Sequence, residues 1–191
     1  MGGSYFSNAG VFLIDVIFGL YIFAVLLRFL LQLVRADFYN PLCQAIVTVT
    51  NPPLRPMRRV IPAVAGIDSA SVILLLGLQM INTGLVALMV GADPAIVGLV
   101  VVAAAELLGK VIWTFIGAII IQVILSWVAQ GNYNPIITVI YALTDPLLGP
   151  ARRLIPPLGG LDLSPMVVII GLQLALMLAV QPLRDLGFSL L

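Results

Sequence analysis

The stretch from Tyr39 to Asp68 reads YNPLCQAIVTVTNPPLRPMRRVIPAVAGID, and a second copy from Tyr133 to Asp162 reads YNPIITVIYALTDPLLGPARRLIPPLGGLD. Every position of the first copy lies 94 residues before its counterpart, as Tyr39 does before Tyr133. Extended without a gap to Gln79, the alignment contains 41 pairs, of which 17 are identical. A similarity at one fixed offset indicates an internal duplication, so we expect two tandem repeats.

The composition is that of a membrane protein. Of the 191 residues, 62% are hydrophobic and 9% are charged, whereas a soluble domain is roughly half apolar and a quarter charged. The net charge of +1 argues against nucleic-acid binding, which needs many cationic groups to displace phosphate counterions. The chain has no histidine and a single cysteine, Cys43. This excludes an internal disulfide, histidine-dependent catalysis and the common zinc, haem-attachment and thiol-redox patterns, so we expect no cofactor and no metal.

Hydrophobic segments flank both copies and set the domain boundaries. Repeat 1 is residues 1–94, with transmembrane helices expected at 11–34 and 70–90 and a loop at 35–69 between them. Repeat 2 is residues 95–191, with transmembrane helices at 105–128 and 165–180 and a loop at 129–164. About 20 helical residues cross a hydrocarbon core of roughly 30 Å. The first apolar run is too long for a signal peptide and is expected to remain as a helix, whereas residues 95–104 form an interfacial or overhanging start.

Each loop is predicted to begin with a short amphipathic helix. Asn40 is a good N-cap and Pro41 a good first residue, while Asn51 and the two prolines after it are expected to end the helix near Thr50. About ten residues span only about 15 Å, too short to cross the membrane. The helix therefore lies in the interface or against the bundle, or it forms a shallow re-entrant segment. Residues 52–62 are expected to be extended or turning.

The even number of crossings in each repeat sets the topology. The predicted fold class is an all-α membrane protein with four transmembrane helices, arranged as two helix–amphipathic loop–helix repeats related by a pseudo-twofold axis along the membrane normal. Both loops then face one compartment. That side carries most of the basic residues, while the other carries only Arg184 and Lys110; the loop set is Arg35, Arg55, Arg58, Arg59, Arg152 and Arg153. The positive-inside rule makes the loops cytoplasmic and places both termini outside.

The duplicated motif resembles that of a known family. Its elements are Tyr-Asn-Pro, then Thr-x-Pro-x-Leu-x-Pro-x-Arg-Arg-x-Ile-Pro, then Gly-x-Asp, between hydrophobic helices, and they resemble the YggT family, also called YlmG. The resemblance covers the chain from about Val11 to Val180. It implies a multi-pass protein of the bacterial inner membrane without enzyme activity. Members of the family have been linked to osmotic-stress protection and ion uptake, to division or nucleoid organisation, and in plastids to cytochrome maturation. The resemblance transfers no binding or catalytic residues.

The paired arginines of the loops have two interpretations. Arg58, Arg59, Arg152 and Arg153 either set the topology and reach lipid phosphates, or converge near the axis on an anionic ligand or an acidic partner loop.

Acidic and hydroxyl residues close each loop. Asp68 and Asp162 are expected to cap the following helices or to pair with the arginines of their own loop. Ser164 is expected to cap the fourth helix.

Several polar residues lie inside the predicted helices. Four of them sit at comparable depth and are predicted to form one belt, either as a hydrophilic site around the axis or as interhelical hydrogen bonds with a snorkelling arginine; they are Arg28, Gln79, Gln122 and Gln173.

Charged and small residues suggest further contacts. Asp15 and Lys110 are predicted to form an ion pair near the outer face, as a stabilising contact or an ion gate. Glu106 can also pair with Lys110, four residues away on one helix. Gly77 and Gly171 are expected to allow close helix contact.

These observations leave two functional hypotheses. The first is a non-catalytic organising or assembly factor, whose duplicated loops bind anionic lipid headgroups or a membrane-protein partner. The second is an ion-flux or osmotic-stress-protection component, in which the polar belt lines a path; four helices make a poor pore, so this hypothesis needs a homo-oligomer. No nucleophile–base pair or metal set is visible, so we expect no enzyme.

Overall fold

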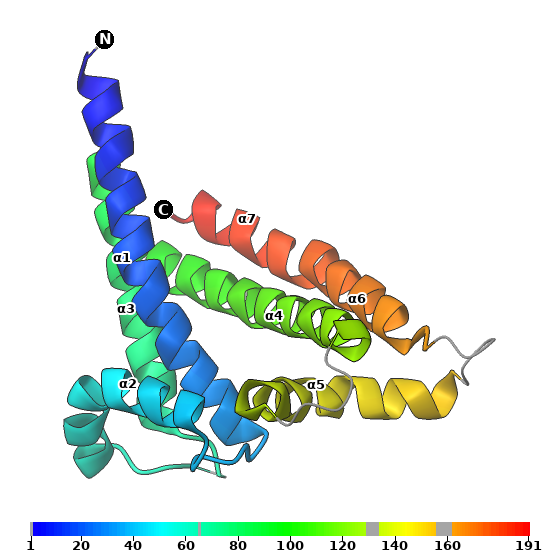
Figure 1. The fold of residues 1–191 in the computed structure, drawn as a ribbon. Helices are drawn as coiled ribbons and strands as arrows, with labels where there is room; N and C mark the ends of the chain where they lie inside the picture. Colours follow the sequence, from blue (N-terminus) through cyan, green and yellow to red (C-terminus); the bar gives the residue numbers. More distant parts are fainter. Residues whose placement is uncertain (1, 65, 129–133, 156–161) are drawn as a thin grey trace.

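The computed structural model describes residues 2–64, 66–128, 134–155 and 162–191, with side chains from residue 5 onward. Figure 1 shows a chain built from helices, with the bounds α1 (Gly2–Leu33), α2 (Pro41–Val60), α3 (Ser69–Met89), α4 (Ile96–Val128), α5 (Pro135–Leu154), α6 (Ser164–Ala175), the π-helical turn η1 (Leu176–Val180) and α7 (Gln181–Ser189). Tyr133, Pro156 and Gly160 of the second motif copy lie outside the described residues.

Within the described residues, four helical segments are long and apolar enough to cross a membrane, which confirms the predicted all-α membrane fold. They are Tyr5–Leu33, Ser69–Met89, Ile96–Val128 and Ser164–Ser189. The 32 residues of α1 and the 33 of α4 correspond to about 50 Å at roughly 1.5 Å per residue. That exceeds a hydrocarbon core of about 30 Å, so both helices extend beyond it or tilt.

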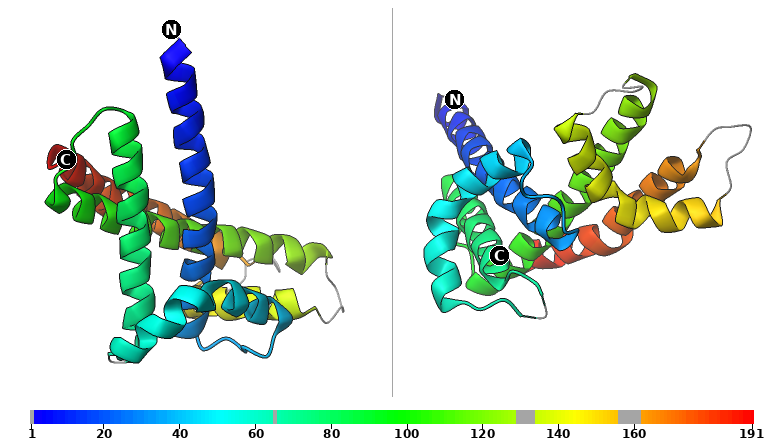
Figure 2. Two further views of the ribbon diagram at one scale, coloured as in Figure 1. Left: turned by 90° about the vertical axis from the view of Figure 1, so that its left-hand side faces the viewer. Right: turned by 60° about the horizontal axis from the view of Figure 1, so that its bottom comes forward.

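The four segments form two hairpins. α1 packs against α3, and α4 packs against α6, η1 and α7. The second hairpin crosses the first at a steep angle, with the start of α4 against α3 (Figures 1 and 2). The expected pseudo-twofold axis along the membrane normal stays a prediction.

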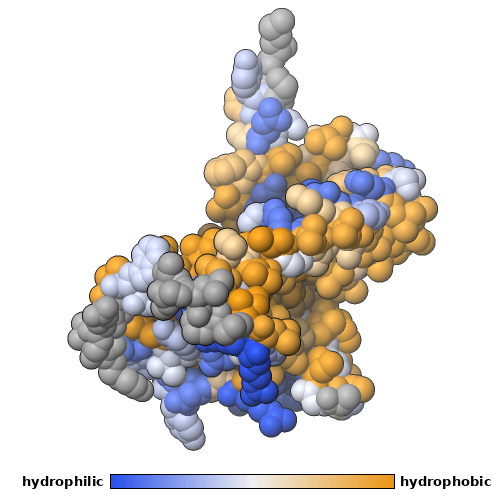
Figure 3. All heavy atoms as spheres, turned by 90° about the vertical axis from the view of Figure 1, so that its right-hand side faces the viewer, coloured by the Kyte–Doolittle hydropathy of each residue, from blue (hydrophilic) through white to orange (hydrophobic). Residues whose placement is uncertain are grey.

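The core lies where the hairpins meet the loop helices. Ile22 and Leu26 of α1 are at most 1% exposed and cluster with Leu75 of α3, Ala118 of α4 and Leu143 of α5. Most other faces of the long helices present apolar side chains outward. Figure 3 shows this on one side, where orange residues dominate and blue ones gather at the lower end and in a band across the upper part. Such a surface suits lipid as the solvent.

The loop helices are longer than predicted. The expected end near Thr50 and the extended stretch at 52–62 are both wrong, because α2 continues to Val60 through Pro52, Pro53 and Pro56. Thr50 and Leu54, one turn apart on the inner face, are both 0% exposed. We attribute the continuation to this packing, which holds the chain on both sides of the prolines and outweighs the lost backbone hydrogen bonds. Figure 2 shows that α2 bends along its length, as prolines inside a helix require.

The second loop repeats this exception. α5 runs from Pro135 to Leu154 with Pro146 and Pro150 inside it. Thr144 and Leu148 again have no exposed surface. The same two buried positions therefore carry both loop helices past their prolines.

Two other helix boundaries differ from those expected. α1 begins at Gly2 instead of residue 11. α4 is continuous from Ile96, which agrees with the overhanging start expected for residues 95–104 and not with the interfacial one. The last segment does not end at Val180 but continues to Ser189. Pro182 has no backbone N–H to donate to the helix. The π turn before it, in which the Gln181 N–H bonds to the Leu176 carbonyl, lets the helix continue past this proline.

Glycines allow close contact, but at other positions than expected. A Cβ built on Gly77 or Gly171 would meet no atom within 4 Å. On Gly98 it would lie 2.7 Å from the backbone of Leu190, and on Gly187 it would lie 2.8 Å from the backbone nitrogen of Val102. The close approach is therefore between α4 and the C-terminal helix, where two glycines let the backbones touch.

Candidate functional site

The two loop helices lie at the same end of the molecule and meet at their N-termini. Asn40 caps α2 as predicted, and Asn134 caps α5 in the same way, because each side-chain oxygen accepts from the backbone N–H two residues later at 2.9 Å. The Asn40 amide also donates to the Pro135 carbonyl at 2.6 Å, which joins α2 to α5. From this junction the helices run apart (Figure 1). The arginine pairs at their far ends therefore lie apart, which favours the first of their two interpretations over convergence on one anionic ligand.

One arginine of each pair is held by an aspartate of its own loop. Arg58 donates to Asp68 through Nε at 3.2 Å and more closely through Nη2. Arg152 Nε lies 2.8 Å from Asp162. The Asp68 side chain is 7% exposed and that of Asp162 is 40% exposed, so the first pair is the more buried. The predicted pairing of these aspartates within each loop is confirmed.

The same aspartates also contact the start of the next helix. Asp68 occupies the N-cap position of α3 and accepts a hydrogen bond from the Ser71 hydroxyl at 2.5 Å. Asp162 accepts from the Ser164 backbone N–H at 2.9 Å. The Ser164 hydroxyl is buried without a partner among the described residues, so its expected role as the cap is wrong. Leu163 occupies the N-cap position of α6, and Asp162, one residue earlier, accepts from the first N–H of the helix.

Both aspartates stay ionised to a lower pH than usual. Burial raises the pKa of Asp68, but the hydrogen bonds from Arg58 and Ser71 outweigh it, and the net pKa lies below the ordinary value. Asp162 has the same balance of burial against Arg152 and Ser164, and its pKa is also lowered. Each clasp between arginine and aspartate is therefore formed at neutral pH.

The other loop arginines face outward. Among the described residues, no hydrogen bond or ion pair joins Arg55, Arg59 or Arg153 to another side chain. On α2, a hollow of about 460 Å³ lies between the two outward arginines; it is lined by Thr48, Asn51, Pro52, Arg55, Pro56 and Arg59.

Two of the four polar residues in the predicted belt anchor the loop helices. Arg28 of α1 donates through Nη1 to the Thr50 hydroxyl of α2 at 2.8 Å, and more weakly to the Val47 carbonyl at 3.5 Å. In the second repeat Gln122 of α4 pairs with Thr144 of α5. Both contacts join residues 22 apart. Sequence analysis missed the threonines, although both copies of the motif contain them at the same position.

The other two residues of the predicted belt lie elsewhere. Gln79 donates to Thr83 at 3.4 Å and lines a cavity of about 680 Å³ between α1, α3, α4 and α7. Gln173 lines a separate hollow of about 190 Å³ beside Glu106 and Arg184. The structure thus distributes the four residues over four places instead of one belt.

The predicted ion pair between Asp15 and Lys110 is absent from the described residues. Lys110 instead lies 3.6 Å from Glu106, the alternative that the four-residue spacing indicated, and Arg184 lies 2.9 Å from the same carboxylate. Asp15 accepts a hydrogen bond from Asn82 at 3.2 Å. Glu106 lies one turn from Lys110 on the same helix, so the Lys110 ammonium pairs with Glu106 instead of Asp15. Asp15 and Lys110 still line the same 680 Å³ cavity.

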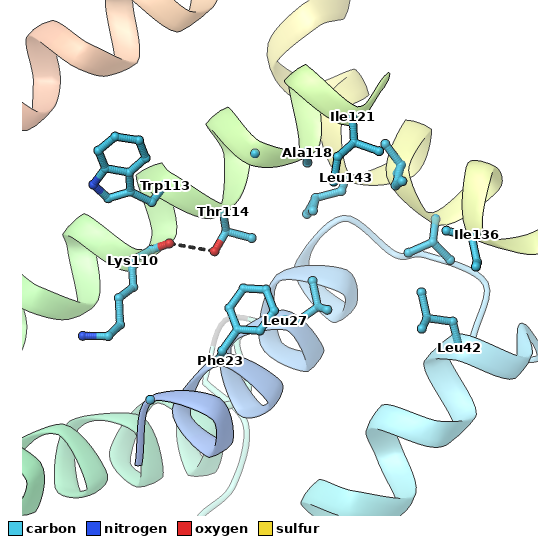
Figure 4. Close-up of a pocket in the computed structure, with 14 residues that line it drawn as sticks. Phe23, Leu27, Leu42, Lys110, Trp113, Thr114, Ala118, Ile121, Ile136 and Leu143 are labelled. Atoms are coloured by element: carbon cyan, nitrogen blue, oxygen red, sulfur yellow. Dashed lines mark hydrogen bonds between the residues drawn. The ribbon is translucent and has the colours of Figure 1, made fainter. Parts of the chain in front are cut away.

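A further hollow lies between α1, α4 and α5 and is almost entirely apolar. Figure 4 shows Phe23, Leu27 and Leu143 facing it, with Lys110 and Trp113 at one end. Its volume is about 470 Å³. Apart from Lys110 and Thr114, the hollow is lined by side chains that suit an apolar group. Elsewhere in the described part of the chain, no cluster of three acidic or cysteine side chains could hold a metal ion.

Fold and sites together define a small multi-pass α-helical membrane protein, in which a duplicated unit holds one amphipathic helix at the same end of each hairpin. The profile of the CCB3/YggT family matches residues 7–89 and again residues 101–183. The chain therefore belongs to the CCB3/YggT family.

Relatives from several bacteria resemble the chain over most of its length. An uncharacterized protein of Pseudomonas aeruginosa is 43% identical, over 93% of this chain and 91% of its own. A protein encoded in the proC 3' region of Vibrio alginolyticus is also 43% identical, over 88% and 91%. YggT of Escherichia coli K12 is 38% identical over 96% of each chain. No solved structure matches.

Proposed function

We propose that the protein is a non-catalytic organising or assembly factor that presents its two loop helices to anionic lipid headgroups or to a membrane-protein partner. The observation that carries this proposal is the matched anchoring of α2 and α5. Each is fixed to a membrane helix by a buried threonine and closed by an arginine–aspartate clasp. A helix held this way presents a stable outer face.

The distribution of charge supports an orientation. Six loop arginines lie in or beside α2 and α5, whereas Lys110 and Arg184, the two basic residues assigned to the other side, share Glu106. Under the positive-inside rule the loop helices are cytoplasmic and both termini are outside, in a bacterial inner membrane. The cytoplasmic leaflet is the anionic one, so the arginines meet acidic headgroups there.

Lipid selectivity tests this proposal. The full-length protein, purified in detergent, is titrated with phosphatidylglycerol or with phosphatidylcholine, and bound lipids are counted by native mass spectrometry. We expect the anionic lipid to bind preferentially, and less so as the salt concentration rises. Equal binding of both lipids would refute the headgroup part of the proposal.

The second candidate function is an ion-flux or osmotic-stress-protection component. The observation that favours it is the 680 Å³ cavity, which brings Asp15, Gln79 and Lys110 together. Ion flux into proteoliposomes tests it, with Gln79→Leu as the variant and Gln173→Leu, its counterpart from the separate hollow, as the control. Flux that is lost only in Gln79→Leu would support this candidate over the organiser; no flux from folded, inserted protein would eliminate it.

A further inference from the structure

The outer face of α2 carries a group of hydrogen-bond donors without an acid to balance them. Asn51, Arg55 and Arg59 are each four residues apart and follow Thr48, so all four lie on one face of the helix and line the 460 Å³ hollow. Among the residues that the structure describes, no aspartate or glutamate lines it. The charge of this face is therefore +2.

The acid that closes the same loop is already occupied. Asp68 is bound to Arg58, which does not line the hollow, and only 7% of the Asp68 side chain is exposed. Pro52 and Pro56, which also line the hollow, have no backbone N–H to offer. Recognition at this face thus depends on the two guanidinium groups and the Asn51 amide. Guanidinium groups suit an oxyanion that accepts several hydrogen bonds at once, as a phosphate does.

The second loop helix, α5, lacks this group of donors. At the offset of 94, Ala142 replaces Thr48, Asp145 replaces Asn51 and Gly149 replaces Arg55, so that only Arg153 remains. The corresponding face of α5 carries one positive and one negative charge. The duplication keeps the anchoring of the two helices but not their outer faces.

The surroundings of the α2 face suit a membrane surface better than free solution. Val49 and Val60, both on α2, are 56% and 83% exposed. α2 also lies across the ends of the membrane helices, where headgroups are found (Figure 2). Exposed valines beside arginines fit the boundary between acyl chains and phosphates.

We propose that the face of α2 formed by Thr48, Asn51, Arg55 and Arg59 binds the phosphate of an anionic lipid headgroup, and that α5 has no equivalent site. The inference rests on the proposed headgroup-binding function and narrows it to one repeat. One high-affinity lipid is then bound per chain.

Matched variants of the full-length protein test the location of the site. Binding of phosphatidylglycerol is measured by native mass spectrometry for Arg55→Gln/Arg59→Gln and for Arg153→Gln. We expect the double variant to weaken binding by roughly 30-fold, because each basic residue near an anionic surface contributes about 1 kcal/mol. Arg153→Gln should change it by less than about 3-fold. All three side chains are exposed, so the variants should fold, which their unfolding temperatures verify.

A gain-of-function variant tests the site without relying on a loss of lipid binding. Asp145→Asn/Gly149→Arg rebuilds the amide and the guanidinium, two of the three missing groups, on α5, and a Cβ at Gly149 would meet no atom within 4 Å. We expect the number of tightly bound lipids to rise from one to two per chain.

The outcomes separate the two proposals. Wild-type protein without preference for phosphatidylglycerol would overturn the headgroup function itself. A preference that survives Arg55→Gln/Arg59→Gln, or that is lost equally in Arg153→Gln, would overturn only the α2 site. Displacement of the lipid by millimolar glycerol phosphate would show a site for soluble phosphates and would overturn the lipid assignment.

Discussion

Replacement of Thr50 by valine isolates the contact between Arg28 and α2. Valine keeps the shape of threonine but cannot accept from the guanidinium. Arg28 is 4% exposed, and its remaining contact would be the Val47 carbonyl at 3.5 Å. A hydrogen bond to a charged group contributes about 1.5–3 kcal/mol, against about 1 kcal/mol for a neutral one.

Thr144→Val is the matched control, because it removes the same atoms from the second repeat. Each threonine hydroxyl also lies within hydrogen-bond distance of the carbonyl four residues earlier, at 2.7 Å for Thr50 and 2.8 Å for Thr144. Thr50 donates to that carbonyl and accepts from Arg28, whereas the single proton of Thr144 serves either its carbonyl or Gln122 Oε1, so the control loses no more neutral hydrogen bonds than Thr50→Val does. What remains is a charged partner, Arg28, against a neutral one, Gln122. We therefore expect Thr50→Val to lower the free energy of unfolding by about 1–2 kcal/mol more than Thr144→Val.

Denaturant unfolding in detergent micelles, followed by tryptophan fluorescence, measures this difference. A double-mutant cycle with Arg28→Met assigns it to the pair, because Thr50→Val should then cost no more than Thr144→Val. If Thr50→Val costs no more than its control in the wild-type background, or if the cycle shows no coupling, the anchoring argument fails.

Three further predictions concern other contacts. Gly187→Leu should destabilise the protein by about 1–3 kcal/mol through overpacking against α4, whereas Gly171→Leu, which meets open space, should change the unfolding midpoint little. Because the pKa of Asp68 is lowered, its ion pair with Arg58 contributes fully to the free energy of unfolding above the ordinary aspartate pKa of about 3.9, and this contribution is lost as the pH falls below that value. Asp68→Asn should therefore make the free energy of unfolding depend less on pH at the acid end. Asp162→Asn should have a smaller effect, because Asp162 is more exposed. Glu106→Gln should lower the unfolding temperature at low salt more than at high salt, because two cations share that carboxylate.

The overall fold was predictable because its signals are strong and local. Four long apolar segments, the constant offset of 94 and the Asn-Pro starts of both loop helices each indicate one structure, and the helices are found where these signals place them. The ends of the loop helices were not predictable from local rules. Proline disfavours a helix interior, and only the burial of Thr50, Leu54 and their counterparts reveals why the helices continue.

The candidate sites were harder to predict because equal depth in a membrane says nothing about direction around a helix. Arg28 and Gln79 lie at similar depths, yet one faces α2 and the other faces the cavity beside Thr83. Pairing within a loop was easier, since Arg58 and Asp68 are ten residues apart on a chain that must turn back. The competition of Glu106 for Lys110 follows from spacing alone, whereas the contribution of Arg184 depends on a helix that continues past Val180.

The internal duplication separates structural residues from functional ones without any second sequence. Positions that match in both copies and make matching contacts, such as Thr50 and Thr144, hold the loop helices in place. Positions that differ between the copies and face outward, such as Arg55 and Gly149, are free of that task. Because a shared scaffold tolerates different outer faces, the two loop helices can serve different ligands. A chimera in which the sequence of residues 142–153 also replaces that of residues 48–59 should therefore fold but lose selective lipid binding.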